Sequence, residues 1–387
     1  MICRLIDYVQ ICICRVRVEY KKLGDIATYI NGYAFKPEQR GSEGLPIIRI
    51  QDLTGNAYDL GYYDGDYPKK IELNDGDVLI SWSASLGVYL WNRGKALLNQ
   101  HIFKVVFDKV EIDKFYFMYA VEYNLDKMSL KTHGATMKHI TKKDFDNVVI
   151  PYPDLDYQKE VSYRLASLKG IIEKYQEQLE LLGELVKARF VEMFGDPVDN
   201  PMNWEKKKLK DIVTEDCTIS YGIVQTGEDQ KEGVPVFRPV DIVNHIPKVE
   251  ELKKTTDSIS NRYKKTLLKG HELLITVRAN IADTFVAGEE YKGCNVGRGI
   301  VPIRTQEDII LIEFLKCLID NKHLNDILKS KAKGITLIQL NMEDLRNIEL
   351  IIPPIDLQID YLKYSRLIDK SRLLSNHSLS LIKSIIF

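Results

Sequence analysis

The sequence predicts an α+β protein with two tandem globular domains, each followed by a long helix, in which the two helices pair as a coiled coil. Three observations carry this prediction: an internal repeat, a proline-containing segment at the end of each copy, and a heptad pattern behind the first of these segments. The chain has 387 residues and is 45% hydrophobic, which is too long for one ordinary core. Its 21 Tyr, 12 Phe and 3 Trp argue against disorder.

The repeat is the most informative of the three observations. The matching segments are Lys22–Ile26 with Lys208–Ile212, Pro46–Leu53 with Pro235–Ile242, and Ile150–Gln158 with Leu350–Gln358. The offset grows from 186 to 200 residues along the copy, so the frame persists while the interior differs in length. This pattern is typical of two modules that do similar work on different targets. A structural duplication with no recognition role is the alternative.

Each copy has the same predicted order of elements. Alternating and continuous apolar runs predict strands at Ile47–Leu53, Asp77–Trp82 and Ile102–Phe107 in the first copy, and at Leu273–Val277, Thr284–Ala287 and Gly299–Ile303 in the second. Helices are expected at Asp113–Met128 and Ile309–Leu328. A last short strand then runs into the prolines, because proline continues neither a ladder nor a helix.

A long helix is predicted behind each proline segment. In the first, apolar residues recur at alternating steps of four and three, which is a strict heptad seam. These seam residues are Val161, Leu165, Leu168, Ile172, Tyr175, Leu179, Leu182 and Val186. Gly195 followed by Pro197 ends the helix. In the second helix, roughly Leu357 to Ile386, we assign Leu367, Leu374 and Leu381 to the seam, diluted by serines. Two unrelated surface helices are the alternative reading.

The ordered pair of motifs resembles a known family. Ile150-Pro151-x-Pro153-x-Leu155-x-x-Gln158, a heptad helix, and a Trp204-Glu205-x-x-x-Leu209 start of a new module are similar to the specificity subunit (HsdS) of type I restriction–modification systems. The resemblance covers about residues 18–387. In one departure from it, the first copy has Val18-Glu19 where the second has Trp204-Glu205.

The resemblance implies a division of the chain into recognition domains and spacer helices. The expected boundaries are a leader or extra strand at 1–17, a first target-recognition domain at 18–153, a first spacer helix at 154–196, a linker at 197–203, a second target-recognition domain at 204–353 and a second spacer helix at 354–387. The two helices are then expected to pair antiparallel. A rod of about 35 residues spans roughly 50 Å, which is more than one turn of DNA.

The resemblance also implies a function without catalysis in this chain. Each domain would read one part of a bipartite, asymmetric double-stranded DNA target, with rod length setting the unread gap. The implied partners are two modification (methyltransferase) subunits and the restriction (translocase and nuclease) subunits. No cofactor is expected here, because S-adenosylmethionine, ATP and Mg would be held by those partners.

The sequence lacks the common motifs for catalysis, which agrees with this expectation. The sequence has no Walker phosphate loop, no Gly-x-Gly-x-x-Gly after a predicted strand, and no amino-methyltransferase tetrapeptide around Pro353-Pro354. Asp196, Glu205 and Lys207 could be forced into a nuclease-like set, but they follow a helix instead of lying on adjacent strands. The seven His and six Cys form no metal-ligand pattern, so no metal site is predicted.

Candidate DNA contacts are the polar residues at predicted strand ends and loops, since base readout needs forked donors and amides, and phosphate contact needs Lys, Arg or Ser. They are Arg49, Gln51, Ser81, Ser83, Asn99, Gln100, His101, Lys104, Lys138 and His139 in the first copy, and Arg238, Arg278, Asn280, Asn295, Arg298 and Lys333 in the second. For each of them, a solvated surface side chain is the competing interpretation.

Overall charge and hydropathy set the remaining expectations. The formal net charge is −1, whereas a dedicated DNA-binding protein often has a basic surplus. A coiled-coil scaffold that binds protein partners without reading DNA is therefore the alternative function. The sequence has no uncharged stretch of membrane-spanning length and no disulfide framework, so a cytoplasmic protein is expected, with no membrane partner.

Overall fold

The computed structural model describes residues 18–56, 59–131, 141–243, 247–334 and 338–386. Residues 1–17 and the candidate contacts Lys138 and His139 lie outside the described residues. The chain forms two compact units, one made of Met1–Glu177 with Asn376–Phe387 and the other of Gln178–Ser375. Both long helices contribute to both units, so these units differ from the predicted domains, which stop where the helices begin.

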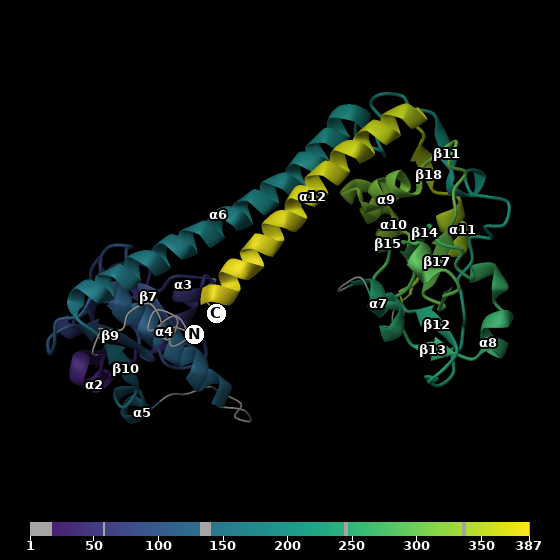
Figure 1. Ribbon diagram of the computed structural model, residues 1–387. Coiled ribbons are helices and arrows are strands. Elements are labelled where there is room, and N and C mark those ends of the chain that lie inside the picture. The colour runs from purple at the N-terminus through teal and green to yellow at the C-terminus, as the bar shows by residue number, and fades with distance from the viewer. Residues whose placement is uncertain (1–17, 57–58, 132–140, 244–246, 335–337, 387) are drawn as a thin grey trace. The chain divides into compact units, whose positions relative to one another are not determined.

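The first unit contains a two-stranded sheet and two four-stranded sheets (Figure 1). In the two-stranded sheet, β1 (Glu19–Lys22) pairs antiparallel with β10 (Val149–Tyr152), so the strand that opens the first globular part lies beside the strand that closes it. The four-stranded sheets have the orders β2-β9-β6-β7 and β4-β3-β8-β5.

The remaining strands of this unit are β2 (Thr28–Asn31), β3 (Leu45–Ile48), β4 (Tyr62–Tyr63), β5 (Glu72–Leu73), β6 (Val78–Ser81), β7 (Gly87–Leu90), β8 (Ala96–Leu98) and β9 (Ile102–Val106). Its helices are α2 (Leu23–Ile26), α3 (Ile50–Thr54), α4 (Lys114–Lys131), α5 (Lys142–Asp146), the first part of α6 (Leu155–Phe194) and the last part of α12 (Ile355–Ile386), with short 3₁₀ turns η1 (Pro37–Gln39) and η2 (Lys69–Ile71).

Strand β6 contributes to the apolar clusters of both four-stranded sheets. All four of its residues are buried. Val78 and Ile80 belong to the apolar cluster against α4, whereas Leu79 belongs to the cluster of the second sheet. Side chains alternate along a strand, so a continuous apolar run fits a strand that is covered on both faces.

The second unit repeats this arrangement with shorter sheets. The pair β11 (Lys206–Lys208) and β18 (Glu349–Ile351) matches β1 and β10. The orders β15-β14-β17 and β13-β12-β16 match β7-β6-β9 and β4-β3-β8 of the four-stranded sheets, including a parallel pair in each copy, β3 with β8 and β12 with β16. Strand β14 also supplies two clusters, with Leu273 and Ile275 in one and Leu274 in the other.

The strands of the second unit are β12 (Val234–Phe237), β13 (Lys254–Thr255), β14 (Glu272–Thr276), β15 (Thr284–Ala287), β16 (Asn295–Val296) and β17 (Ile300–Ile303). Its helices are the last part of α6, α7 (Pro239–Val243), α8 (Asp257–Asn261), α9 (Ile312–Asp320), α10 (Lys322–Ser330), α11 (Met342–Arg346) and the first part of α12, with 3₁₀ turns η3 (Leu209–Asp211), η4 (Val249–Glu251), η5 (Lys264–Thr266) and η6 (Glu289–Tyr291).

Two predicted elements are wrong in detail, each because of a local cap. The predicted strand Ile47–Leu53 ends as β3 at Ile48, since Arg49 and Asp52 cap the short helix α3. The predicted helix Ile309–Leu328 is interrupted at Asn321, whose side-chain oxygen accepts the backbone N–H groups of His323 and Leu324 at 3.0 and 3.4 Å and starts α10.

The long helix α6 has the predicted seam. All eight seam residues are buried or half-buried, while the residues between them are mostly exposed. In the second unit, the end of α6 packs on the start of α12: the ring of Phe194 lies 5.6 Å from that of Tyr361, and the Arg189 guanidinium lies 5.8 Å from the ring of Tyr364. Later residues of α6 thus meet earlier residues of α12, so the two segments run antiparallel.

The predicted seam of α12 is wrong by one position. Leu367, Leu374 and Leu381 are 69%, 63% and 52% exposed. The less exposed positions instead follow steps of three and four through serines as well as apolar residues: Tyr361, Tyr364, Ile368, Ser371, Ser375, Ser378 and Ile382. The assignment followed the leucines, whereas the contact uses small side chains. None of the described helices combines the length and apolar character that crossing a bilayer requires.

Candidate nucleic-acid interface

A matching arginine–aspartate turn follows the central strand of one sheet in each unit. Arg49 donates its backbone N–H and its Nε to Asp52 Oδ2 at 2.8 and 3.0 Å. Arg238 makes the same bonds to Asp241 at 2.7 and 3.1 Å. The hydrogen bond that each arginine donates to its aspartate raises the pKa of the guanidinium above its ordinary value.

These turns belong to the frame of each domain. Arg49 is buried and also donates to the carbonyl of Asp59, so its prediction as a DNA contact is contradicted. Arg238 keeps a partly exposed side chain, but Asp241 already holds it. Gln51 is exposed on α3, two residues further on.

A second matching feature is the loop that follows β6 in the first unit and β14 in the second, the two strands that are buried on both faces. In the first unit, buried Ser81 donates its hydroxyl to the carbonyl of Ser85 at 2.5 Å. In the second unit, buried Thr276 donates its hydroxyl to the carbonyls of Asn280 and Asp283. The structure therefore contradicts Ser81 as a DNA contact, because its hydroxyl closes the loop from inside.

Both of these loops contain an alanine in the left-handed region. Ala84 has φ 57° and Ala279 has φ 62°. Such a conformation costs free energy for a residue with a Cβ and is retained only where the surroundings enforce it, as at ligand-binding loops. The loops present half-buried Ser83 and Arg278 and exposed Asn280.

The turn that leads into β9 in the first unit, and into β17 in the second, lies beside this loop. The backbone N–H of Trp82 donates to the carbonyl of His101 at 3.3 Å, and in the second unit the backbone N–H of Val277 donates to the carbonyl of Gly299 at 2.8 Å. We call Trp82–Ser85 with Gln100–His101 the first loop edge. Val277–Asn280 with Arg298–Gly299 is the second loop edge.

Glycines bring a third segment close to each of these turns. A Cβ on Gly32 would lie 1.9 Å from the carbonyl oxygen of Asn99, and a Cβ on Gly222 would lie 1.8 Å from that of Val296. Only glycine fits at such a distance. The two edges are therefore held by the same backbone contacts.

Several predicted contacts have structural roles at these turns. Asn295 has no exposed surface; its amide donates to Ser260 Oγ at 3.0 Å and its oxygen accepts from Thr266 Oγ1 at 2.8 Å. Asn99 is buried, so neither asparagine reaches a base edge in this conformation. Their predictions as contacts are contradicted by this burial. Trp82 packs against His101 and Phe103, with ring centroids 5.0 and 5.5 Å apart.

Lys104 is also engaged inside its domain. Its Nζ lies 2.7 Å from Asp77 Oδ2 and donates to the carbonyl of Glu72 at 2.7 Å. Its side chain is mostly buried, so it offers little charge to a phosphate.

The edges nevertheless present distinct exposed groups. Gln100 is exposed on the first edge, and half-buried His101 beside it has φ 71°. On the second edge, exposed Arg298 lies over the ring of Tyr221 at 5.9 Å. Sequence reasoning missed Tyr221; an aromatic residue just before a close-approach glycine was the available signal.

Arg278 is held by a neutral partner. Its Nε donates to Gln339 Oε1 at 2.7 Å, and its Nη2 donates to the same oxygen. Among the described residues it has no carboxylate partner, so its charge remains available to a ligand. Gln339 also forms a backbone bridge with exposed Lys333, which brings Lys333 to the same edge. Sequence reasoning missed Gln339, since nothing local links it to Arg278.

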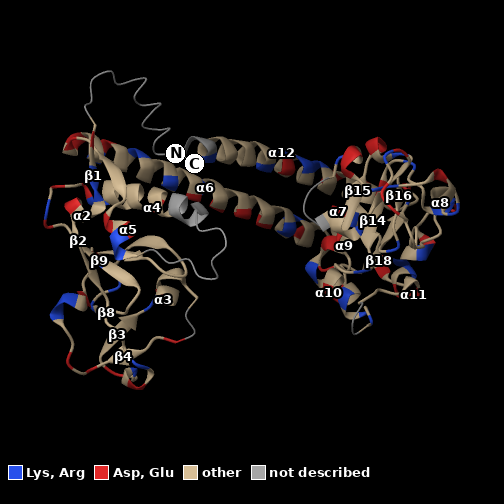
Figure 2. Cartoon of the chain, turned by 90° about the horizontal axis from the view of Figure 1, so that it is seen from below, with Lys and Arg blue, Asp and Glu red and all other residues tan. Residues whose placement is uncertain are grey.

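Charge is not segregated on a large scale. Figure 2 shows Lys and Arg interspersed with Asp and Glu along α6 and around the globular part of each unit. Basic character near a loop edge is therefore a local property of a few side chains, such as Arg278, Arg298 and Lys333.

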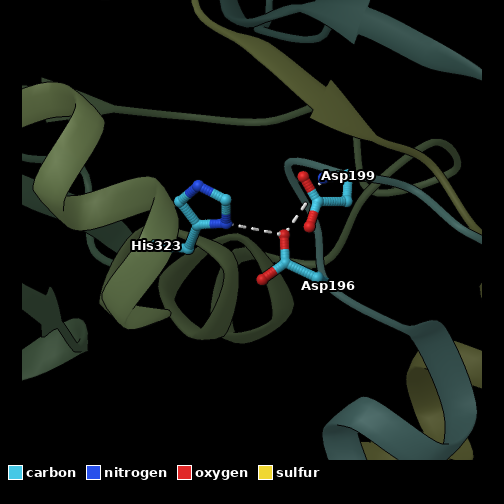
Figure 3. A group of neighbouring side chains, drawn as sticks. All are labelled: Asp196, Asp199 and His323. Atoms are coloured by element: carbon cyan, nitrogen blue, oxygen red, sulfur yellow. Dashed lines mark hydrogen bonds and ion pairs between the residues drawn. The ribbon is translucent and has the colours of Figure 1, made fainter.

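One group of possible metal ligands occurs among the described residues (Figure 3). Asp196, Asp199 and His323 bring ligand atoms within 4.8 Å of one another. Asp196 Oδ1 lies 3.1 Å from His323 Nδ1 and accepts the Val198 N–H at 2.8 Å. These bonds tie the turn after α6 to the start of α10, which is a sufficient structural role. Glu205 and Lys207, which were considered together with Asp196 in the sequence, pair with each other at 3.6 Å.

Comparison with known proteins gives one consistent result. The family model for the type I restriction modification DNA specificity domain matches residues 15–182 and 201–376. The EcoBI specificity subunit of Escherichia coli is 24% identical over 362 residues, covering 87% of this chain and 76% of the relative. The MjaVIII specificity subunit of Methanocaldococcus jannaschii is 26% identical over 211 residues, covering 50% of this chain and 49% of the relative.

Two solved structures have the same fold. The S subunit of a type I restriction–modification system from M. genitalium aligns with a TM-score of 0.55 at 14% identity, over 97% of this chain and 95% of that chain. A chain from a study of complex assembly and conformational transition of the type I R-M system aligns with a TM-score of 0.59 at 17% identity, over 97% of both chains.

Proposed function

Because the chain belongs to the type I restriction modification DNA specificity family, we propose that it reads a bipartite, asymmetric DNA target and docks the modification and restriction subunits of its complex. The family match covers both copies of the repeat, so each copy is assigned one part of the target. Chemistry would then be carried out by the partner subunits.

The observation that carries this proposal is the pair of loop edges. Each edge is built on the same buried frame: an arginine–aspartate turn, a buried hydroxyl that closes a loop, and a glycine under the neighbouring turn. The groups on top differ, with Ser83 and Gln100 on the first edge against Arg278 and Arg298 on the second. A shared frame with different donors favours two similar docking modes that read different bases.

Direct readout follows from the chemistry of these groups. An arginine fork suits the N7 and O6 acceptors of guanine, and a glutamine amide suits the donor and acceptor of adenine. The second edge therefore favours a guanine-containing half-site, and the first edge a half-site without an arginine contact. The two half-sites would differ, which makes the target asymmetric.

Selection from a random duplex library tests the proposal. The full chain, co-expressed with its modification partner, should enrich two unlike half-sites separated by an unread gap. Binding should weaken as salt rises, because phosphate contacts release counterions. A palindromic motif, or equal binding to all sequences, would refute the proposed readout. A complex that assembles but never binds DNA would instead identify a protein scaffold.

Exposed leucines on the helices support the docking role. On α12, Leu367, Leu373 and Leu374 project into solvent beside the basic residues Arg366 and Lys370. A helix face of this kind is typical of a protein interface. We assign it to the modification subunit, and Leu374→Glu should weaken co-purification with that subunit while leaving the fold intact.

Two copies of the modification subunit are supported by the repeat. Leu181 on α6 and Leu381 on α12 lie at equivalent positions, 200 residues apart, and are 61% and 52% exposed.

S-adenosylmethionine, ATP and Mg would be held by the partner subunits. The described cysteines Cys217, Cys294 and Cys317 are free thiols, which supports a cytoplasmic location.

A further inference from the structure

Two buried glutamines occupy matching positions at the start of the long helices. Gln158 lies in the first turn of α6 and Gln358 in the first turn of α12, and they are 1% and 0% exposed. Burying an amide is unfavourable unless its donor and acceptor are both used. Their contacts therefore indicate what each glutamine does.

In the first unit, Gln158 joins the helix to the globular part. Its Oε1 accepts the backbone N–H of Asp113 at 2.9 Å, directly before α4 begins at Lys114. Its Nε2 donates to the carbonyl of Pro153 at 2.8 Å, directly before α6. One side chain thus bridges the starts of two helices that belong to different parts of the unit.

In the second unit, Gln358 makes the same bridge. Its Oε1 accepts the backbone N–H of Leu311 at 3.0 Å, directly before α9 begins at Ile312. Its Nε2 donates to the carbonyls of Pro353 and Ile309 at 2.8 and 3.1 Å.

Two other side-chain hydrogen bonds described at the first joint are not repeated at the second. In the first unit the Tyr116 hydroxyl donates to the carbonyl of Pro151 at 2.9 Å, and Ser162 donates to Asp113. The corresponding residues of the second unit are Phe314 and Leu362, which are buried and apolar. The glutamine is therefore the polar contact that both joints share.

We propose that Gln158 and Gln358 are positioning residues that fix the direction in which each long helix leaves its domain, and thereby the gap at which the two half-sites are read. This inference rests on the proposed bipartite readout. Moving a half-site by one base pair shifts it by about 3.4 Å and turns it by roughly 35° about the DNA axis. A rigid joint rejects such a shift, whereas a loosened joint tolerates it.

A series of duplexes with altered gaps tests this inference. Each duplex keeps both selected half-sites and changes only the gap, by one to three base pairs in either direction. The binding of the full chain with its modification partner is measured for the wild type, Gln158→Leu, Gln358→Leu and the control Gln176→Leu. Gln176 is exposed on the same helix α6, so this control makes the same chemical change away from the joint.

The expected result separates gap from base recognition. Both joint variants should keep the base preferences of each half-site, while the preference for the best gap over its neighbours falls by about tenfold or more. Gln176→Leu should keep the wild-type gap preference. Thermal melting of every variant reports whether it has folded.

Gln158→Glu provides a second variant if leucine disrupts the fold. Glutamate keeps an acceptor for the Asp113 N–H but loses the donor to Pro153 and brings a carboxylate against that carbonyl, so a loss of gap preference is expected here as well. Folded joint variants with wild-type gap preference would overturn the inference alone. A wild-type chain that selects no gapped motif would refute the proposed function and this inference with it.

Discussion

Arg278→Ala is the substitution that most directly tests the second loop edge. Gln339 holds Nε and Nη2 of this arginine, and Nη1 has no protein acceptor among the described residues. The guanidinium is thus oriented yet able to donate further. A bidentate contact to guanine contributes about 1–3 kcal/mol, which corresponds to a loss of roughly 5- to 150-fold in affinity for the selected target.

The assay must distinguish a base contact from a phosphate contact. We expect Arg278→Ala to lower affinity for the selected duplex and to relax selection at one base pair, with little effect on random DNA. Arg278→Lys should behave similarly, because lysine keeps the charge but loses the fork. Arg262→Ala, at the exposed end of α8 in the same unit, is the matched control.

Two results would refute this reasoning. An equal loss of affinity on all duplexes, with the salt slope reduced by about one, would identify a phosphate contact. Unchanged affinity and selection would remove Arg278 from the interface.

The other predictions concern the frame and the helices. Asn295→Ala should destabilise the second unit by about 1–3 kcal/mol in chemical denaturation, because it leaves Ser260 and Thr266 without their buried partner; a stability change within 0.5 kcal/mol would contradict this. Lys269 and Thr214 hold the pKa of Asp216 well below its usual range, so its stabilising effect is present above about pH 4 and is lost as the carboxylate is protonated in acid. Asp216→Asn should therefore flatten the acid side of the stability curve, and an unchanged curve would count against the ion pair. On α12, Ser375→Leu should lower the free energy of unfolding by about 1–3 kcal/mol through overpacking, whereas Leu374→Ser should have little effect. A larger loss of stability for Leu374→Ser than for Ser375→Leu would instead support the seam first predicted from the leucines.

The register of α12 shows what a repeat adds to a heptad pattern. Leucines at 367, 374 and 381 are spaced by seven, yet they face solvent. Applying the 200-residue offset to the seam of α6 instead gives eight positions, of which Tyr361, Ser365, Ile368, Ser375, Leu379 and Ile382 are buried or half-buried, whereas Arg372 is exposed. The sequence held the correct register, but side-chain hydrophobicity alone selected the wrong one because small residues fill the contact.

The predicted DNA contacts also divide into residues that are exposed and residues that are buried. Loop residues such as Gln100 and Arg298 were predicted from polarity at strand ends, and they are exposed. Arg49 and Asn295 have the same polarity but are buried, because their partners Asp52, Ser260 and Thr266 satisfy them internally. Polarity predicts a need for hydrogen bonds. Whether DNA or the protein meets that need depends on long-range packing, which a single sequence does not display.

In each domain the buried hydrogen-bonded residues are separate from the exposed residues of the loop edge, and this affects how base specificity can change. Arg238 is bound by Asp241, Thr276 closes its loop from inside, and Gln358 fixes the joint, so these interactions are complete within one domain. Arg298 and Asn280 lie outside that network on exposed turns. Substitution at the edge therefore leaves the buried hydrogen bonds and core intact, and surface changes of this kind usually alter stability by less than about 0.5 kcal/mol. A loop edge can therefore change its exposed donors while the frame of its own domain keeps its hydrogen bonds.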